Sequence, residues 1–426
     1  MDDRIVVTGM GLISSLGHTA RETWDSLLSG RSGIQPIKDF DASGFDCRAA
    51  AQVKGLDPSV LNIHPRDARI MDKHSVMLMK CAHDAFAQAG IAGRGIPGEE
   101  IGLFAGMGMV DYKVDDLLPA VLKSRDSHGN FSYERFFTEG YQEIYPLWPL
   151  SMLNNISFCQ VAISLDIRGE NAVFSPHADS GAQAISEAVE VLIDRRAKVV
   201  LAGGVSEKVS PSSLARAHLS NTLNRTDSDH ENPCRPFGAD RKGTVPGEGC
   251  GMIALELKSS ADDRGVPYRA VLSGYGFSFG LGEDDPAPTT GAITRSMLAA
   301  MEKAGVDAKD IDVIVANGDG TCRGDANEMV AIYSVFSDCI ETIPVYSSKS
   351  ALGHMYAGAP AVDIILALYM IENGVIPAVL TPGPLDEEIR FQLVSDAPLM
   401  KKSGRIMVNC QSYEGQAASL IIEAVD

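Results

Sequence analysis

Apolar positions along the chain form short continuous runs that alternate with longer runs of helical spacing. Residues 4–14 (RIVVTGMGLIS) predict a buried strand, and residues 19–30 predict a helix with Thr19 as N-cap and Glu22 at capping-box spacing. By the same criteria we expect strands at 100–109, 198–207, 310–321, 404–415 and 417–426, and helices at 75–90, 181–197, 292–305 and 358–374. This alternation predicts an α/β protein with mostly parallel central sheets.

The pattern of strands and helices occurs twice along the chain. The 426 residues are more than one small core needs. One series of strands and helices ends near residues 259–266, and a second series begins there. We therefore expect two similar halves, residues 1–260 and 261–426. Two segments, 111–145 and 206–249, are less regular, and long irregular segments in a compact fold often serve function or assembly.

Charge and cysteine usage narrow the class of function. The formal net charge of −19 disfavours nucleic acid and anionic membranes as partners. There is no apolar run of membrane-spanning length and no signal-peptide pattern, so a cytoplasmic protein is expected.

The cysteines have no metal-site spacing and are expected to be free thiols; we expect neither a metal nor an organic cofactor. They are Cys47, Cys81, Cys159, Cys234, Cys250, Cys322, Cys339 and Cys410.

Four segments together resemble the elongating β-ketoacyl-acyl carrier protein synthases of the thiolase-like superfamily. They are VVTGMGLISSLG, LLSGRSGIQPIKDFDASGF, CRPFGADRKGTVPGEGCGMIALE and SSKSALGH. The resemblance runs nearly end to end and keeps order and spacing. It implies a duplicated five-layered α/β/α/β/α sandwich that works as a dimer.

The family's chemistry uses a cysteine at a strand-to-helix turn, two histidines and a lysine. The cysteine accepts the acyl chain as a thioester, and the histidines assist decarboxylation of malonyl and stabilise the enolate. Here the turn is GENAVFSPHADSGAQAIS, and an ungapped count from Gly169 and from Ser180-Gly181 places Ala178 at the cysteine position. A methyl group cannot form a thioester.

Two other parts of the family's site also depart from the pattern. In NGDGTCRGDANE we align Asp319 with the first histidine, with a loop two residues shorter before Asp325; Lys349 and His354 remain in SSKSALGH. The glycine-rich C-terminal gating loop is replaced by QSYEGQAA, which should make it stiffer. The residues at its flexible positions are Gln411, Ser412, Tyr413 and Glu414.

Relatives that lack the cysteine include the chain length factors of type II polyketide synthases, and this is the leading interpretation. It implies a heterodimer with an active ketosynthase, in which this subunit shapes the chain cavity, and an acyl carrier protein partner that brings the only phosphopantetheine. The resemblance implies a cavity lined by Met107, Met109, Tyr112, Leu147 and Trp148, with ordinary interface core as the alternative. Carrier docking is expected at Arg66, Arg69 and Lys73, with a solvated helix face as the alternative.

Two other classes of function stay open. One is an enzyme with a relocated nucleophile, for which the turn and two cysteines offer Ser175, His177, Asp179, Ser180, Cys322 and Cys410. Residues adjacent in sequence do not by themselves form a triad, however, and Asp179 at a helix start is better explained as a cap. The other class is a purely structural subunit that stabilises its partner.

Overall fold

The computed structural model describes residues 4–58, 63, 71–93, 95–111, 114–225, 233–282 and 287–425. Its main feature is one large sheet whose strand order is β12-β10-β9-β14-β15-β8-β1-β7-β6-β4-β5. These strands are β1 (Ile5–Ser14), β4 (Ile101–Met107), β5 (Asn171–Phe174), β6 (Val199–Val205), β7 (Gly249–Leu257), β8 (Ala270–Phe279), β9 (Val313–Val315), β10 (Pro344–Tyr346), β12 (Gln392–Leu393), β14 (Arg405–Gln411) and β15 (Gln416–Ala424).

Both halves of the sheet share one topology. In the first half β1, β7 and β6 pair antiparallel, and β4 and β5 continue parallel to β6. In the second half β8, β15 and β14 pair antiparallel, and β9 and β10 continue parallel to β14. The sheet is therefore mixed, and the expectation of mostly parallel sheets was wrong. The halves meet where Ile5 and Val6 of β1 pair with Leu272 and Val271 of β8.

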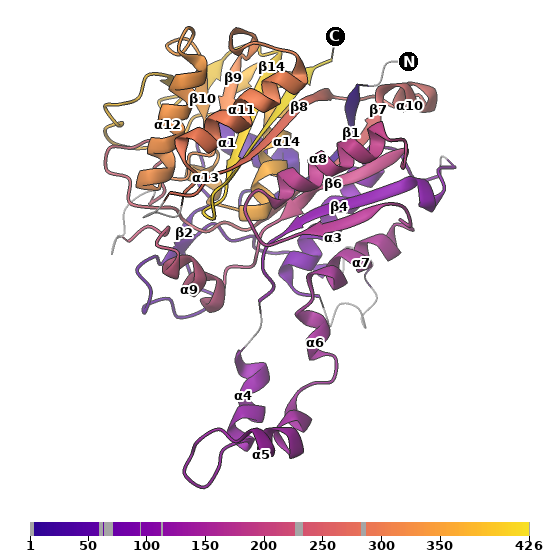
Figure 1. The fold of residues 1–426 in the computed structure, drawn as a ribbon, viewed down its shortest axis with the longest axis vertical. Helices are drawn as coiled ribbons and strands as arrows, with labels where there is room; N and C mark the ends of the chain where they lie inside the picture. Colours follow the sequence, from indigo (N-terminus) through magenta and orange to yellow (C-terminus); the bar gives the residue numbers. More distant parts are fainter. Residues whose placement is uncertain are drawn as a thin grey trace.

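The two halves of this sheet, the helices between them and the helices on the two outer sides form five layers (Figure 1). Helix α3 covers β1, β6 and β7 on one outer side, and α11 covers β8 and β15 on the other. Helices α8 and α14 contact each other between the halves, and α14 touches strands of both. The helices are α1 (Ala20–Leu28), α3 (Lys73–Gln88), α4 (Val114–Lys123), α5 (Tyr133–Thr138), α6 (Trp148–Ser151), α7 (Asn154–Ser164), α8 (Ser180–Ile193), α9 (Pro211–Leu219), α10 (Lys258–Arg264), α11 (Thr290–Ala304), α12 (Cys322–Phe336), α13 (Lys349–Leu352) and α14 (Ala359–Asn373).

Smaller elements complete the described chain. Thr19 caps α1 as expected, because its side chain accepts a hydrogen bond from the Glu22 amide. Two small antiparallel sheets pair β2 (Gln35–Pro36) with β3 (Ala49–Ala50) and β11 (Val375–Ile376) with β13 (Leu399–Met400). Four 3-10 helices are η2 (Gly98–Glu100), η3 (Gly140–Glu143), η4 (Ala308–Asp310) and η5 (Tyr356–Gly358).

Alternation along the strands builds separate cores on the two faces of the sheet. On β6, Val200 and Ala202 join the central core with α8 and α14, whereas Val199 and Leu201 join the outer core with α3. Both sets are fully buried. A strand buried on both faces reads as a continuous apolar run, and this is why the sequence predicted these strands correctly.

Glycines at matching places in β1 and β8 let the outer helices approach closely. A Cβ on Gly9 would lie 2.2 Å from the Ala85 carbonyl oxygen of α3, and one on Gly274 would lie 2.2 Å from the Ala300 oxygen of α11. Real side chains cannot approach a carbonyl oxygen so closely. The same sheet-to-helix contact therefore occurs in both halves.

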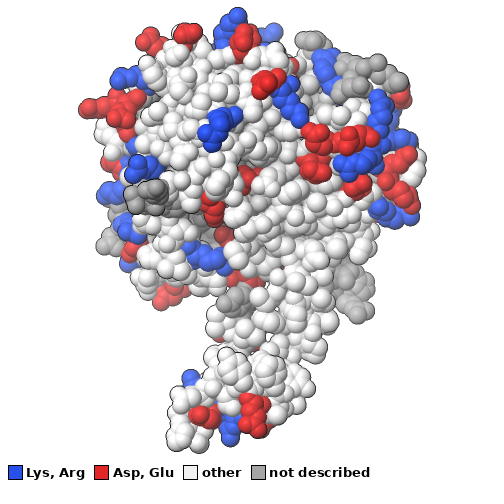
Figure 2. Space-filling view, viewed as in Figure 1, with Lys and Arg blue, Asp and Glu red and all other residues white. Residues whose placement is uncertain are grey.

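An arm formed by α4, α5, η3 and α6 projects from the layered body (Figure 1). Much of its surface carries no charge, and charged residues gather at its tip (Figure 2). Large side chains stand exposed on it, among them Tyr133 at 74% and Phe137 at 68%. Exposed apolar groups in this number are typical of a surface that a partner covers. In the described part of the chain, no helix is long and apolar enough to cross a membrane.

A buried ion pair ties the end of the first half to α3. Arg264 donates to both carboxylate oxygens of Glu256, at 2.9 and 2.7 Å, and to the Ala89 carbonyl oxygen at 2.8 Å. The Glu256 side chain is fully buried, and Thr8 also donates to it. Removal of the guanidinium would leave a buried carboxylate without its counter-charge.

We predict that Arg264→Ala lowers the free energy of unfolding by about 3 kcal/mol, because the charge of Glu256 becomes uncompensated. The matched control is Arg269→Ala, which removes a half-exposed pair with Glu372 and should cost less than about 1 kcal/mol. Urea denaturation followed by circular dichroism measures both. Equal losses in the two variants would contradict this assignment.

Candidate functional site

The strand-to-helix turn between β5 and α8 is the centre of the candidate site. Ala178 lies in this turn, two residues before α8, and only 3% of its surface is exposed. Its amide donates to the Ser412 hydroxyl at 3.3 Å, and its carbonyl accepts from the Cys410 thiol at 3.3 Å. The position thus offers a methyl group and a backbone amide that already has an acceptor.

The turn's other polar residues do not form a catalytic triad. Asp179 precedes α8, but its side chain makes no capping bond; it accepts from the side-chain amide of Gln183 at 2.5 Å instead, so the cap expected there was wrong. Burial raises the pKa of the Asp179 carboxyl. The His177 Nδ1 lies 3.3 Å from Glu414, and the Ser412 hydroxyl donates to that same carboxylate.

Lys349 begins α13, and His354 follows its end by two residues. The Lys349 ammonium pairs with Asp363 at 2.5 Å, with both side chains 1% exposed, and Ser348 donates to the same carboxylate at 2.6 Å. His354 is completely buried, and its Nδ1 accepts from the Tyr356 amide at 3.0 Å. Burial and the nearby Lys349 charge lower the pKa of His354 to about 3. The imidazole is therefore neutral, with its proton on Nε2.

Asn317, which the sequence analysis did not select, lies directly between the strand end and the C-terminal loop. Its side-chain oxygen accepts from the backbone amide of Gln411 at 3.1 Å, and its own backbone amide donates to the Glu328 carboxylate at 2.9 Å. The Asp319 carboxylate instead accepts from the Thr321 amide at 2.8 Å and hydroxyl at 2.7 Å, at the start of α12. Counting back from Asp325 without a gap would have found Asn317.

The C-terminal loop is the tight turn of the β14–β15 hairpin. The Ser412 amide donates to the Gln416 carbonyl at 2.9 Å, and the Gly415 amide donates to the Ser412 carbonyl at 3.0 Å. Gln411 and Ser412 are buried, and Tyr413 packs 5.6 Å from the His354 ring. These contacts hold the loop against the turn at Ala178.

A cavity of about 140 Å³ opens where the turn, the loop and η5 meet. Its walls include Met109, Ala178, Tyr356, Tyr413 and the ion pair of Glu207 with Arg216. Of the residues predicted to form a cavity, the structure places Met109 there. Met107 lies in the outer core, Leu147 and Trp148 are on the arm and do not line this cavity, and Tyr112 is outside the described residues.

The predicted carrier-docking residues receive little support from the structure. The Lys73 ammonium is engaged by the fully buried carboxylate of Glu248, so Lys73 serves an internal ion pair rather than a docking surface. Arg66 and Arg69 lie outside the described residues.

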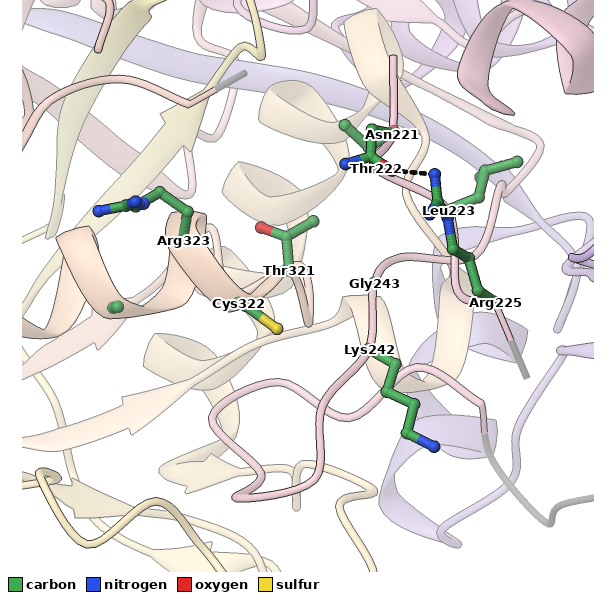
Figure 3. A pocket seen from close by; sticks show the side chains of 10 residues that line it. Asn221, Thr222, Leu223, Arg225, Lys242, Gly243, Thr321, Cys322 and Arg323 are labelled. Carbon is green, nitrogen blue, oxygen red and sulfur yellow. Dashed lines mark hydrogen bonds between the residues drawn. The ribbon is translucent and has the colours of Figure 1, made fainter. Parts of the chain in front are cut away.

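A second hollow, of about 530 Å³, adjoins the first through Thr222, which lines both. Three separate segments form it, and they bring Arg225, Lys242 and Arg323 to its walls (Figure 3). Thr321 and Cys322 stand at the start of α12, and the Cys322 thiol donates to the Arg241 carbonyl at 3.3 Å. Basic side chains near a helix N-terminus suit an anionic group. Sequence reasoning missed this hollow because its segments are far apart in the chain.

Comparison with known proteins now gives the family. The beta-ketoacyl synthase N-terminal domain matches residues 2–261, and the C-terminal domain matches residues 269–381. The chain therefore belongs to the beta-ketoacyl synthase family and has its thiolase-like fold.

Similar proteins cover the whole chain at modest identity. The 3-oxoacyl-[acyl-carrier-protein] synthase 2 of Staphylococcus aureus (strain N315) is 28% identical over 99% of this chain and 98% of its own. Nodulation protein E of Rhizobium meliloti (strain 1021) is 29% identical over all of both chains. Among solved structures, the ishigamide ketosynthase/chain length factor superposes with a TM-score of 0.86 at 25% identity, with full coverage of both chains.

The neutral, buried His354 gives a pH-dependent stability that can be measured. In the unfolded chain the His354 imidazole is protonated below its ordinary pKa of 6.5. In the folded chain its pKa is about 3, so it stays neutral down to that pH. Stability is thus lost as pH falls from 6.5 towards 3, by about 3 kcal/mol at pH 4.

We predict that His354→Asn, which can still accept from the Tyr356 amide, flattens the loss of stability between pH 7 and pH 4. Chemical denaturation at several pH values measures the slope. His128→Asn, at an exposed loop position, should leave the slope as in the unmodified chain. An unchanged slope in His354→Asn would show that other groups carry it.

Proposed function

We propose that this chain is a catalytically degenerate ketosynthase subunit, a chain length factor that pairs with an active ketosynthase. The observation that carries the proposal is Ala178 in an otherwise retained site. The Lys349–Asp363 ion pair and the neutral His354 are in place, but Ala178 puts no thiol in the turn. A condensing enzyme needs a nucleophile there to hold the acyl chain.

The position of the first histidine supports the same conclusion. Since Asn317 lies two residues after β9 and contacts the C-terminal loop, we propose that Asn317, rather than Asp319, stands in the place of that histidine. An amide side chain cannot act as a general base at neutral pH. Condensation by this chain alone would therefore lack two groups, the nucleophile and one base.

The arm and the sheet edge support a protein partner. The arm exposes Tyr133, Phe137 and other large side chains, and β5 ends the sheet with an unpaired edge among the described strands. Such surfaces are typical of obligate interfaces and unfavourable in a free monomer. One of the similar solved structures is titled a ketosynthase/chain length factor, which favours a ketosynthase as the partner.

The basic hollow supports a role for an acyl carrier protein. Its three basic side chains suit the phosphate of a phosphopantetheine arm, and it adjoins the cavity beside Ala178. The chain needs no metal or organic cofactor for this role. The similar protein from Staphylococcus aureus is named a synthase, so the competing candidate is an enzyme whose nucleophile has moved.

Intact-protein mass spectrometry decides between these functions. The chain is exposed to acyl- and malonyl-loaded carrier protein, alone and with a co-expressed ketosynthase. We expect an acyl adduct on the ketosynthase and none on this chain, in a stable one-to-one complex.

An adduct on this chain would instead establish a relocated nucleophile. Cys322→Ser, Cys410→Ser and Ser412→Ala would then locate it. A stable complex with no effect of Met109→Ala on product length would favour a purely structural subunit.

We also predict that Phe137→Asp, on the arm, raises the Kd of the subunit pair at least tenfold, because it buries a charge at the interface. Phe137 is 68% exposed in the chain, so its own folding should be unaffected. Analytical ultracentrifugation gives the Kd. The matched control is Tyr333→Asp on α12, half exposed at 50%, which should pair normally. Equal weakening by both would argue against the arm as the interface.

A further inference from the structure

Several buried polar atoms at or near the cavity beside Ala178 have no hydrogen-bond partner among the described residues, and two of the residues that carry them, Tyr356 and Tyr413, line the cavity. They are the Tyr356 hydroxyl, the Tyr413 hydroxyl, the His354 Nε2 and the Thr244 hydroxyl. The Thr244 hydroxyl lies near enough to Tyr413 to affect its pKa, but the two do not meet in hydrogen-bond geometry. Unpaired buried polar groups are costly and rare, so a group of them indicates a site for something else.

The rings that carry three of these atoms pack together. His354 stacks on Tyr356 with centroids 4.7 Å apart, and Tyr413 lies 5.6 Å from His354 and 6.4 Å from Tyr356. Because the His354 Nδ1 accepts from the Tyr356 amide, its Nε2 carries the proton and is a donor. Burial raises the pKa of both tyrosines, so their hydroxyls are also protonated donors. Two of these donors, the hydroxyls of Tyr356 and Tyr413, therefore belong to residues that line one small cavity, and the His354 ring packs against both tyrosines.

The backbone at Tyr356 is held in an unfavourable conformation. Its φ of 45° lies in the left-handed region, which an aromatic residue adopts only when the surroundings impose it. Strain of this kind gathers at binding sites, where it places a side chain that could not otherwise be there. At Tyr356 it brings the ring onto His354 and to the cavity wall.

We propose that Tyr356 and Tyr413 make this cavity selective for an oxygen-bearing acyl group, a β-keto thioester, over a saturated one of equal length. This deepens the proposed function, on which it rests for the choice of an acyl ligand. A β-keto thioester brings two carbonyl oxygens that can accept from the two phenol hydroxyls. A saturated acyl thioester brings only one and would leave one hydroxyl buried and unpaired, and sites built to hydrogen-bond discriminate strongly against such analogues.

The cavity's size agrees with a short group. Its 140 Å³ holds about four or five water molecules at liquid density, enough for a few carbon and oxygen atoms but not for a long chain. The tyrosines would thus read the acyl unit next to the carrier's thioester. A longer chain would have to extend elsewhere, such as across the subunit interface.

The test compares two amide-linked pantetheine probes, acetoacetyl-pantetheine and butyryl-pantetheine, which differ only in the keto oxygen. Isothermal titration calorimetry gives their Kd values on the full chain, in the oligomeric state in which it purifies. We expect the acetoacetyl probe to bind at least tenfold more tightly. In Tyr356→Phe/Tyr413→Phe that preference should fall to twofold or less, while butyryl-pantetheine binds as well or better.

Tyr333→Phe, at an exposed position on α12, is the matched control and should keep the full preference. Equal Kd values for the two probes, or a preference that survives in the double variant, would overturn the proposal. Failure of the acetoacetyl probe to bind would overturn it as well. Loss of pairing with a ketosynthase, measured separately by ultracentrifugation, would instead count against the proposed function and leave these Kd values interpretable.

Discussion

The site depends on one close backbone approach in the centre of the molecule. The Ala357 carbonyl of η5 lies against Gly181 at the start of α8 and against Gly204 of β6. A Cβ on these glycines would stand 2.3 and 2.0 Å from that oxygen. This contact sets Tyr356 and His354 against the turn that carries Ala178. Any side chain at Gly181 or Gly204 would push the second half away from the first and open the site.

Around that contact, the chain has the buried Lys349–Asp363 ion pair and the buried His354, while Ala178 occupies the turn between β5 and α8. The Lys349–Asp363 pair is buried and hydrogen-bonded, which is costly to retain without reason because desolvation offsets much of the attraction. The Ala178 amide is already occupied by the Ser412 hydroxyl. Ser412 in turn donates to Glu414, which His177 approaches. These polar contacts hold the C-terminal loop against the turn that carries Ala178.

The same features are compatible with the proposed role of a subunit that shapes the chain cavity. A subunit that only shapes space has no need of a nucleophile, but it needs rigid walls and a partner. The α8–α14 layer and the tight β14–β15 turn provide rigid walls. The apolar arm offers a surface for the proposed partner. Tyr356 and Tyr413 add hydrogen-bond donors to those walls. Shape and polarity can then select a chain even where no bond is made.

The sequence by itself determined the strands buried on both faces, the helix caps such as Thr19, the duplicated order of elements and the alanine at position 178. Periodicity and ungapped motif spacing are local, and a local pattern is enough for these. Only the tertiary structure decided that Lys73 pairs internally with Glu248, that Met107 belongs to the core, and that Asn317 rather than Asp319 contacts the C-terminal loop. It alone brought Tyr356 and Tyr413 to one cavity. These facts depend on contacts between segments that are far apart in the chain, and no local pattern encodes which side chains such contacts will bring together.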